Sequence, residues 1–389
     1  MPPPGQEFLP YGRQTIEEDD IAAVAQALRG DYLTTGPTVE AFEAAFAAKV
    51  GARHAVACSN GTASLHLAML ALGIGARDTC IVPSITFLAT ANCAAYVGAE
   101  VVFADVDPGS GLMTPETLAD ALSRAKGPVR AVLPVHLRGD VCDLPALARI
   151  ASDAGAVLVE DAPHALGGTM DFGGGPERVG DCAHAAMASF SFHPVKTIAT
   201  GEGGMITTND PALAGRLRTL RSHGMTRPPG AEPWVYEMAE PGFNYRLPDI
   251  NSALGLSQLA KLDRFTGRRR ALTALYRERL APLTTIVRIA AQPVWSDPAL
   301  HLFCVLIDFD ALGVCRAEVM QRLAEAGIGS QVHYIPVHSQ PYWRSRNGEL
   351  DLPGARAWYD RCLSLPLFPG MADSDVERVI SALEAALGL

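Results

Sequence analysis

Short apolar runs and amphipathic stretches alternate along the first half of the chain. The apolar runs have no polar face, which is typical of strands that are buried on both sides of a sheet. These runs cover residues 54–58, 80–83, 101–107, 131–135 and 156–161. The stretches between them, such as 115–125 and 144–154, repeat apolar residues at helical spacing. Strands that alternate with helices predict an α/β fold with a mostly parallel sheet, covered by helices on both faces.

The second half of the chain extends this pattern and then changes it. Apolar runs over 183–192 and 204–208 predict two further strands. Asp249 is expected to open one long helix that extends toward Arg279, a length that suits a connector between domains. Beyond it, the pattern predicts a small α+β domain. Its expected strand and helices cover 302–309, 315–326 and 373–387.

Local signals add a first helix and a hairpin. Thr15 is expected to cap the helix, with Glu18 at the capping-box position and Gly30 at its end. The Gly-rich stretch 167–181 is expected to form a hairpin. A chain of 389 residues is long for one core, so we expect two domains. They are a large domain over 13–255 and a small domain over 256–389, with an N-terminal arm over 1–12.

Composition narrows the function classes. The net charge of −10 argues against nucleic-acid binding as the main activity, although it does not exclude anionic small substrates. Residues 1–7 have no basic start and no apolar core, and no apolar stretch reaches the length of a membrane span. The eight cysteines are scattered without C-x-x-C pairs, so we expect reduced thiols in a cytoplasmic protein and no metal site.

The first candidate for chemistry is Lys196, which follows an apolar stretch with Phe190 and Phe192 and precedes a turn rich in threonine and glycine. A lysine must be neutral to attack an aldehyde, and desolvation by the two phenylalanines would favour the neutral form. Lys196 is therefore a candidate for a Schiff base with a cofactor. The alternative is a partly exposed lysine in a loop, and this stretch alone leaves both open.

Asp161 is the second candidate, because a carboxylate after four apolar residues at a strand end needs a cationic partner. The protonated pyridine nitrogen of pyridoxal phosphate (PLP) is such a partner, and an Asp upstream of a Schiff-base lysine is the arrangement that PLP chemistry uses. Residues 162–166 could instead start a helix with Asp161 as its N-cap. This residue alone does not separate the two interpretations.

Further candidates surround these two. Residues 60–63, between a strand and a helix, and Ser191 could donate hydrogen bonds to a phosphate. Phe87 could stack on a pyridine ring, and His164 could contact the ring or its hydroxyl. The alternative for residues 60–63 is a turn that binds nothing. The alternative for Phe87 is a core aromatic residue, and that for His164 is a solvent-facing helix residue.

Five segments together resemble the DegT/DnrJ/EryC1/StrS aminotransferases, the PLP-dependent sugar aminotransferases of fold type I. In chain order they are 59–63, 83–92, 160–167, 191–204 and 242–250. The resemblance covers nearly the whole chain. It implies a fold-type-I PLP-dependent transferase, in which a mostly parallel seven-stranded sheet lies between helices and a small α+β domain follows at the C-terminus.

The resemblance also implies roles for single residues. Lys196 would form the Schiff base and move a proton between C4′ of the cofactor and the sugar carbon, while Asp161 would pair with the pyridine nitrogen. Asn244 would reach the phosphate from the other subunit, so the active unit would be a homodimer with shared sites. The full set of cofactor-binding residues would be Gly61, Thr62, Ala63, Phe87, Asp161, His164, Ser191, Lys196 and Asn244.

Within the family, segments 191–196, 221–225 and 331–338 most resemble the transaminase of pseudaminic acid biosynthesis. That enzyme aminates C4 of a UDP-linked 4-keto-6-deoxy-N-acetyl sugar with glutamate as the amino donor. The resemblance implies that the sugar nucleotide contacts Tyr11, Asp31, Tyr32, Leu33, Thr34, Gly61, His333, Tyr334, Ile335 and Pro336. An ordinary loop between domains is the alternative for His333, Tyr334 and His338.

Three departures from the family pattern leave the choice of sugar open. Pro163 replaces a small residue, 171–177 is longer and richer in glycine than usual, and the loop 227–234 is distinctive. The nucleotide (UDP, GDP or dTDP), amination at C3 or C4, and a keto substrate without a nucleotide also remain open. Lys196 argues against the sugar 3-dehydratases of this family, which have His at that position. A non-catalytic binding protein is a further alternative, against which the set of Asp161, Ser191, Lys196 and Asn244 argues.

Overall fold

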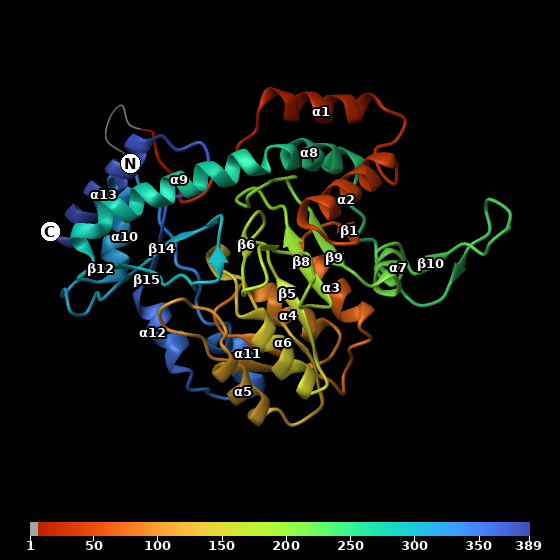
Figure 1. Cartoon of the computed structure of the whole chain (residues 1–389), viewed down its shortest axis with the longest axis horizontal. Coiled ribbons are helices and arrows are strands. Elements are labelled where there is room, and N and C mark those ends of the chain that lie inside the picture. Colours follow the sequence, from red (N-terminus) through yellow and green to blue (C-terminus); the bar gives the residue numbers. More distant parts are fainter. Residues whose placement is uncertain (1–6) are drawn as a thin grey trace.

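A computed structural model describes residues 7–389, and its central element is a seven-stranded sheet (Figure 1). The strand order is β1-β9-β8-β5-β4-β2-β3. Their bounds are β1 His54–Cys58, β2 Thr79–Pro83, β3 Glu100–Ala104, β4 Val129–Val132, β5 Val157–Asp161, β8 Met187–Ser191 and β9 Gly204–Thr208. Only β9 runs antiparallel to its sheet neighbours β1 and β8, whereas the pairs from β8 to β3 are parallel. The predicted α/β fold with a mostly parallel sheet is confirmed.

Helices pack against this sheet, as the amphipathic stretches predict. α3 packs on β8 and β9, α6 packs on β5, and α5 packs on β3. Asn60, Thr114, Asp143 and Asp210 accept backbone N–H bonds at the starts of four of these helices, which explains why the helices begin there. Their bounds are α2 Pro37–Val50, α3 Gly61–Ala71, α4 Leu88–Tyr96, α5 Pro115–Arg124, α6 Leu144–Asp153 and α7 Pro211–Leu220.

The first helix, α1 (Glu18–Arg29), begins later than the sequence predicts. Its N-cap is Glu17, whose backbone N–H donates to the Asp20 carboxylate at 2.9 Å. Asp20 also accepts hydrogen bonds from Ser257 and Gln258 of α8 (Asp249–Ala260), at 2.6 and 2.7 Å. The predicted Thr15 cap is therefore wrong, because this buried contact with α8 sets the start of α1.

The single long helix predicted after Asp249 is also wrong, because it consists of α8 and α9 (Leu262–Leu280). Lys261 separates them, and its N–H donates to the Gln258 carbonyl three residues back, which tightens the turn. The Lys261 ammonium contacts Asp19 and Asp20 at 2.6 and 2.7 Å. Figure 1 shows α9 continuing from α8 across both halves of the molecule.

The C-terminal part has its own sheet, β12 (Val287–Ile289), β14 (Phe303–Ile307) and β15 (Cys362–Leu365). A second cluster of buried apolar residues fills it, including Tyr276, Leu323 and Leu383. The remaining helices are α10 Arg316–Glu325, α11 Pro341–Asn347, α12 Pro353–Arg361 and α13 Asp373–Leu387. The predicted boundary between the large and the small domain, at 255/256, falls inside α8. This boundary stays a prediction.

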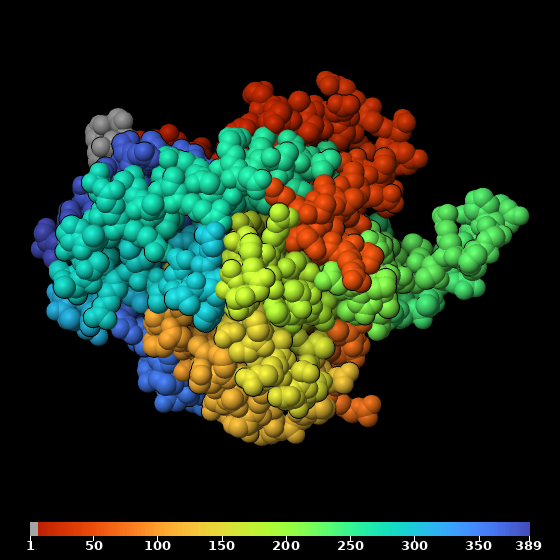
Figure 2. Space-filling view, viewed as in Figure 1, coloured from red at the N-terminus to blue at the C-terminus, as the bar shows by residue number. Residues whose placement is uncertain are grey.

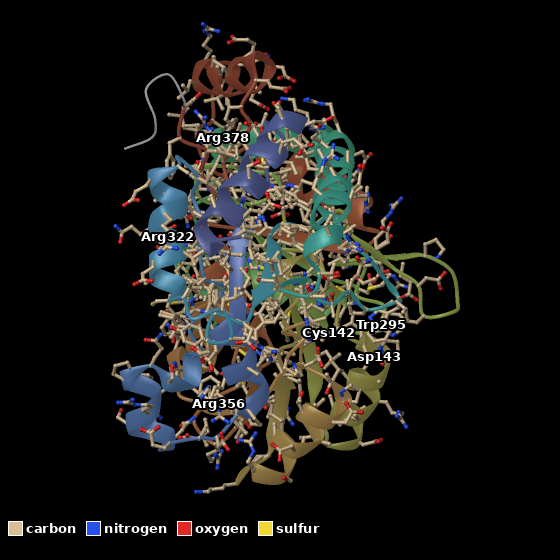
Figure 3. The ribbon with its side chains drawn as sticks, turned by 90° about the vertical axis from the view of Figure 1, so that its left-hand side faces the viewer. Cys142, Asp143, Trp295, Arg322, Arg356 and Arg378 are labelled. Atoms are coloured by element: carbon tan, nitrogen blue, oxygen red, sulfur yellow. The ribbon has the colours of Figure 1, made fainter. Side chains whose placement is uncertain are left out.

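The N-terminal arm pairs with this C-terminal part. Leu9 forms a parallel bridge with Ile328 and belongs to the second apolar cluster. The first six residues of the predicted arm lie outside the described residues. Figure 3 shows Trp295, from the segment before β14, beside Cys142 and Asp143 of the large sheet's connections. Its indole donates to the Val141 carbonyl at 2.9 Å, which links the two parts.

Two small hairpins lie outside the central sheet. β6 (Thr169–Met170) and β7 (Glu177–Arg178) form the hairpin predicted over 167–181, and β13 (Ser296–Asp297) joins it. β10 (Met225–Thr226) and β11 (Glu237–Met238) form an arm that projects from the body, as Figures 1 and 2 show. Among residues 7–389, no helix is both long and apolar enough to cross a membrane.

Candidate active site

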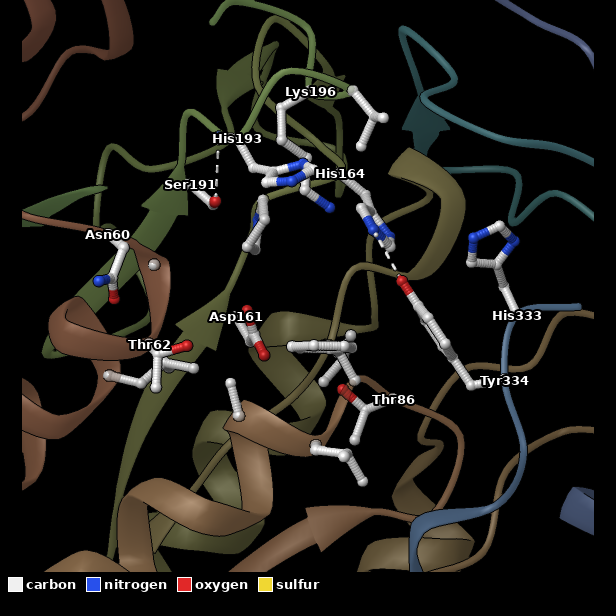
Figure 4. A pocket seen from close by; sticks show the side chains of 18 of the residues that line it. Asn60, Thr62, Thr86, Asp161, His164, Ser191, His193, Lys196, His333 and Tyr334 are labelled. Atoms are coloured by element: carbon white, nitrogen blue, oxygen red, sulfur yellow. Dashed lines mark hydrogen bonds between the residues drawn. The ribbon is translucent and has the colours of Figure 1, made fainter. Parts of the chain in front are cut away.

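A cavity of about 1140 Å³ lies where the parallel strands end and the C-terminal part meets the sheet. Asp161 ends β5 and Ser191 ends β8, so both strands deliver polar side chains to it. The segment from Gln331 to Ile335 forms the opposite wall. Figure 4 shows several of these side chains around the cavity. The predicted site residues that line it are Tyr11, Gly61, Thr62, Ala63, Phe87, Asp161, His164, Ser191, Lys196, His333, Tyr334 and Ile335.

Lys196 lies in a tight turn after β8, where its N–H donates to the His193 carbonyl at 2.8 Å. The side chain is partly exposed toward the cavity, but protein surrounds its amine closely. This burial lowers the pKa of Lys196 to about 8, although the negative charge of Asp161 opposes the shift. The amine is therefore far easier to deprotonate than an ordinary lysine.

The predicted cause of this desolvation is wrong. Phe190 and Phe192 are buried, but their rings pack against Phe42 and Phe46 of α2. Side chains alternate along a strand, so the two phenylalanines face the core while Ser191 faces the cavity. The walls of the cavity, rather than these rings, desolvate the Lys196 amine.

Asp161 is 6% exposed, and one of its oxygens accepts a hydrogen bond from the Thr90 hydroxyl at 2.5 Å. Thr90 in turn pairs with the Thr86 hydroxyl at 2.6 Å. Burial raises the pKa of Asp161, and the Thr90 bond and the charge of Lys196 oppose this shift. Residues 162–166 form turns and no helix, so the interpretation of Asp161 as a helix cap is excluded. A buried carboxylate that faces a cavity is unfavourable unless a cationic group pairs with it, so this site favours a ligand with such a group.

The start of α3 lies at the end of the cavity opposite His333 and Tyr334 (Figure 4). Asn60 caps the helix by accepting the Ala63 N–H at 2.8 Å, so the Ala63 amide is already engaged. The Gly61 and Thr62 amides precede the first intrahelical bond and have no partner within the helix. With the helix dipole, they favour an anion such as a phosphate.

Gly61 packs so closely on the strand β8 that a side chain cannot fit. A Cβ atom at this position would lie 2.7 Å from Ser191 Cβ and 3.1 Å from its hydroxyl. We expect Gly61→Ala to displace Ser191 and weaken the affinity for a phosphate-bearing cofactor by about tenfold or more, through loss of at least one hydrogen bond to a charged group. Titration of the purified protein with PLP measures this. Gly267→Ala is a matched control, because a Cβ there meets no atom within 4 Å; equal affinities in both variants would contradict the expectation.

Phe87 is not the core aromatic residue, and His164 is not the solvent-facing helix residue, that the alternative interpretations predict. Phe87 is 58% exposed and lines the cavity 6.2 Å from the Tyr334 ring, so it is not a core residue. His164 is 6% exposed and is not in a helix. Its Nδ1 accepts the Arg138 backbone N–H at 3.3 Å, and its Nε2 lies 3.3 Å from the Tyr334 hydroxyl. Burial holds the pKa of His164 well below its usual value, so the ring is neutral with its proton on Nε2.

Some predicted site residues lie elsewhere. Asp31 and Tyr32 line a separate hollow of about 480 Å³ between α1 and α8. Leu33 and Thr34 follow in the same exposed loop. Asn244 is exposed and pairs with Ser222 outside the cavity of its own subunit. Pro336 follows Ile335 but is not among the lining residues.

The structure adds residues that sequence reasoning missed. Thr90 lies four residues after Thr86, and this helical spacing within the 83–92 segment is a signal that could have placed both hydroxyls together. His66 and Tyr245 line the cavity next to the α3 start, with their side chains 3.2 Å apart. His301 lines the opposite wall, and a lone histidine before a strand carries no sequence signal.

The charge of the cavity is unusual for a site that takes anions. Of the residues that the structure describes, Lys196 is the single lysine in its lining, and no arginine lines it. Among residues 7–389, no group of three or more His, Cys, Asp or Glu side chains is arranged to hold a metal ion. Positive charge therefore comes from Lys196 and from the dipole of α3.

Residues 14–384 match the DegT/DnrJ/EryC1/StrS aminotransferase family, and this match spans nearly the whole chain. The chain belongs to this family. Spr1654 of Streptococcus pneumoniae, solved in PLP and PMP forms, is 26% identical with a TM-score of 0.88, over 98% of this chain and 99% of that one. DesV of S. venezuelae is 32% identical over 98% and 99%, with a TM-score of 0.86. PseC of Helicobacter pylori, an aminotransferase of pseudaminic acid biosynthesis, is 25% identical over 98% and 100%, with a TM-score of 0.87.

This family member is a PLP-dependent aminotransferase, and its cavity fits the cofactor. Asp161 offers a buried carboxylate to a pyridinium, the α3 start offers free amides to a phosphate, and Gly61 leaves room for it. Bound PLP supplies an electron-accepting ring and a reactive aldehyde carbon. Lys196 would attach to that carbon and hold or release a proton at Nζ. Asp161 would keep its negative charge against the ring nitrogen, and Phe87 would cover one face of the site.

Proposed function

We propose that this enzyme transfers the amino group of L-glutamate to C4 of a nucleotide-linked 4-keto-6-deoxy sugar. The proposed substrate is UDP-4-keto-6-deoxy-N-acetyl-altrosamine, as in pseudaminic acid biosynthesis. The observation that carries the proposal is Lys196 facing the Asp161 carboxylate in one cavity, with the charge of each group acting on the other. The likeness to PseC supports the choice of substrate.

The size and lining of the cavity support a large second ligand. Its volume of about 1140 Å³ exceeds the usual range for a single drug-sized ligand. PLP would occupy the end near Asp161 and α3, which leaves the wall of Tyr11, His333, Tyr334 and Ile335 for the sugar substrate. In this proposal His164 lies beside the ring hydroxyl, and Thr62 and Ser191 bind the phosphate. Ala63 only lines this end of the cavity, because Asn60 already accepts its amide N–H.

A panel of keto sugars tests the substrate. The enzyme is loaded with PLP, treated with glutamate, freed of small molecules, and then mixed with each keto sugar. We expect the visible chromophore to bleach with glutamate and to return with the UDP-linked 4-keto sugar. Return only with GDP-4-keto-6-deoxymannose or a dTDP-linked 3- or 4-keto sugar would establish that alternative. A chromophore that never responds to glutamate would leave a non-catalytic binding protein.

We further propose that two copies form a homodimer with shared sites. Asn244 and the loop 31–34 are exposed and lie outside the cavity of their own subunit, so a second copy could receive them. The projecting β10–β11 arm supports this, because Trp234 and Tyr236 are 74% and 62% exposed on it. Large apolar side chains gathered on an arm are typical of an interaction surface. We also propose that the large domain ends at residue 255, that the small domain begins at residue 256, and that the enzyme is cytoplasmic.

The arm gives the test of the dimer. We expect the double variant Trp234→Ser, Tyr236→Ser to weaken association by about tenfold or more, since aromatic anchors contribute on the order of 2 kcal/mol each to interfaces. Analytical ultracentrifugation over a concentration series measures the dissociation constant. Val294→Ser is the matched control, because Val294 is 98% exposed and lies just before β13, which pairs with β6 and not with the arm. If both proteins dissociate alike, the arm does not form the interface.

A further inference from the structure

His301 is a buried histidine in the wall of the active-site cavity, just before β14. It is 4% exposed. Its backbone is held on both sides, because its N–H donates to the Arg138 carbonyl at 2.7 Å and its carbonyl accepts from the Arg269 guanidinium at 3.2 Å. The position of the ring in the wall is therefore set by the surrounding backbone.

The two ring nitrogens of His301 have different surroundings. Nδ1 is enclosed and has no hydrogen-bond partner among residues 7–389. Nε2 is the nitrogen left to face the cavity that His301 lines. A buried N–H without an acceptor is less favourable than a buried lone pair, so the proton belongs on Nε2. His301 thus points an unused N–H donor into the cavity.

Two further imidazoles, those of His164 and His333, lie in the same wall. His164 has its Nδ1 occupied by the Arg138 N–H, and its ring centre lies 4.7 Å from that of His301. His333 has its Nδ1 paired with the Ser364 hydroxyl at 2.7 Å. Burial lowers the pKa of all three histidines, that of His333 to about 3, and the charge of Lys196 lowers each further. All three imidazoles are therefore neutral. The Nε2 of His164 already faces the Tyr334 hydroxyl at 3.3 Å, so the donor left for a ligand is the Nε2–H of His301.

This wall matters because the cavity has few other groups for a carboxylate. Within the described range 7–389 no arginine lines it, and Lys196 is committed to the cofactor. The amides at the start of α3 serve the phosphate. An amino donor such as glutamate still brings two carboxylates, and neutral N–H groups hydrogen-bond to a carboxylate strongly in a desolvated site.

We propose that His301 binds a carboxylate of the amino donor through its Nε2–H, as the central group of a carboxylate subsite formed with His333. The inference rests on the proposed function, since it assigns the donor's place in the same cavity. It makes His301 a determinant of donor affinity. The keto sugar, which brings no carboxylate, depends on His301 much less.

Glutarate, a dicarboxylate of the same length as glutamate that has no amino group, gives a test without turnover. Its dissociation constant is measured by calorimetry with the PLP-loaded enzyme. We expect His301→Phe, which keeps a flat ring beside His164 but has no N–H, to weaken glutarate binding about 10- to 100-fold. His301→Gln, whose amide reaches the place of Nε2, is expected to recover most of this loss. His184→Phe is the matched control, because His184 pairs with Glu177 outside the cavity and its replacement leaves glutarate affinity unchanged.

Three results would overturn the proposal. They are equal glutarate affinity in His301→Phe and wild type, no glutarate binding by the wild type, and loss of bound PLP from both His301 variants, which would make the role structural. Failure of the proposed function looks different. In that case the wild type binds glutarate and His301→Phe does not, but glutamate never bleaches the chromophore.

Discussion

Replacing Lys196 by alanine is expected to lower the rate of amino transfer by at least about 10³-fold, because the site loses both its nucleophile and its proton carrier. No other lysine of the described part of the chain lines the cavity, so none there can take its place. Lys49→Ala is the matched control, since Lys49 pairs with Asp263 on the surface. Amino transfer from glutamate is followed by the absorbance of the cofactor, and the Lys196 variant is expected to lack the visible chromophore of the linked form.

The pKa of Lys196 gives a second check on the same residue. Its value of about 8 lies below that of a free lysine, so the free amine dominates above pH 8. The rate of PLP capture by the empty enzyme is expected to rise with pH through about 8 and then to level off. Below pH 8 the folded state also carries a buried ammonium that is less favourable than in the unfolded chain. Lys196→Ala is therefore expected to melt no earlier than the wild type without cofactor. Wild-type activity in this variant, or a capture rate still rising above pH 9, would contradict the assignment.

Replacing Asp161 by asparagine is expected to have the next largest effect, a loss of about 10²–10³-fold in rate. Asparagine keeps the shape of the side chain and can still accept the Thr90 hydroxyl through its amide oxygen. It cannot carry the negative charge that would hold a pyridine nitrogen protonated. The variant therefore isolates the charge of Asp161 from its packing.

Half-reaction rates with glutamate measure this loss, with Asp263→Asn on the exposed surface as the control. We expect the Asp161 variant to bind PLP and to keep the covalent link with Lys196. Its absorbance is expected to shift because the ring nitrogen loses its proton. A rate within threefold of the wild type would mean that the carboxylate supports the fold and not the ring.

Much of the fold follows from local sequence patterns. Strands buried on both faces must be apolar throughout, so β1 and β5 are visible as uninterrupted runs. Polar residues directly after such runs mark the carboxyl ends of strands, where ligands bind in parallel sheets. Asp161 at the end of β5 and Thr62 shortly after β1 follow this rule, and both line the cavity.

Other features depend on contacts between distant segments. The break at Lys261 accompanies its ion pairs with Asp19 and Asp20, which lie more than 200 positions earlier in the chain. Phe192 faces α2 because strand alternation turns it away from Lys196, and an apolar stretch does not reveal which neighbour each ring meets. The sequence pattern can therefore place a residue in an element without giving its partner.

The sequence by itself determined the mostly parallel sheet, the lysine turn after β8 and the acidic end of β5, because periodicity and strand ends are local properties. Only the tertiary structure decided how the amine of Lys196 is desolvated and which residues complete the cavity. His301 lines the same cavity as Lys196 although 105 positions of sequence separate them. The position of its ring depends on the hydrogen bonds of the His301 backbone to the Arg138 carbonyl and the Arg269 guanidinium. Burial and hydrogen-bond partners are collective properties of the packed chain, so no single stretch of sequence contains them.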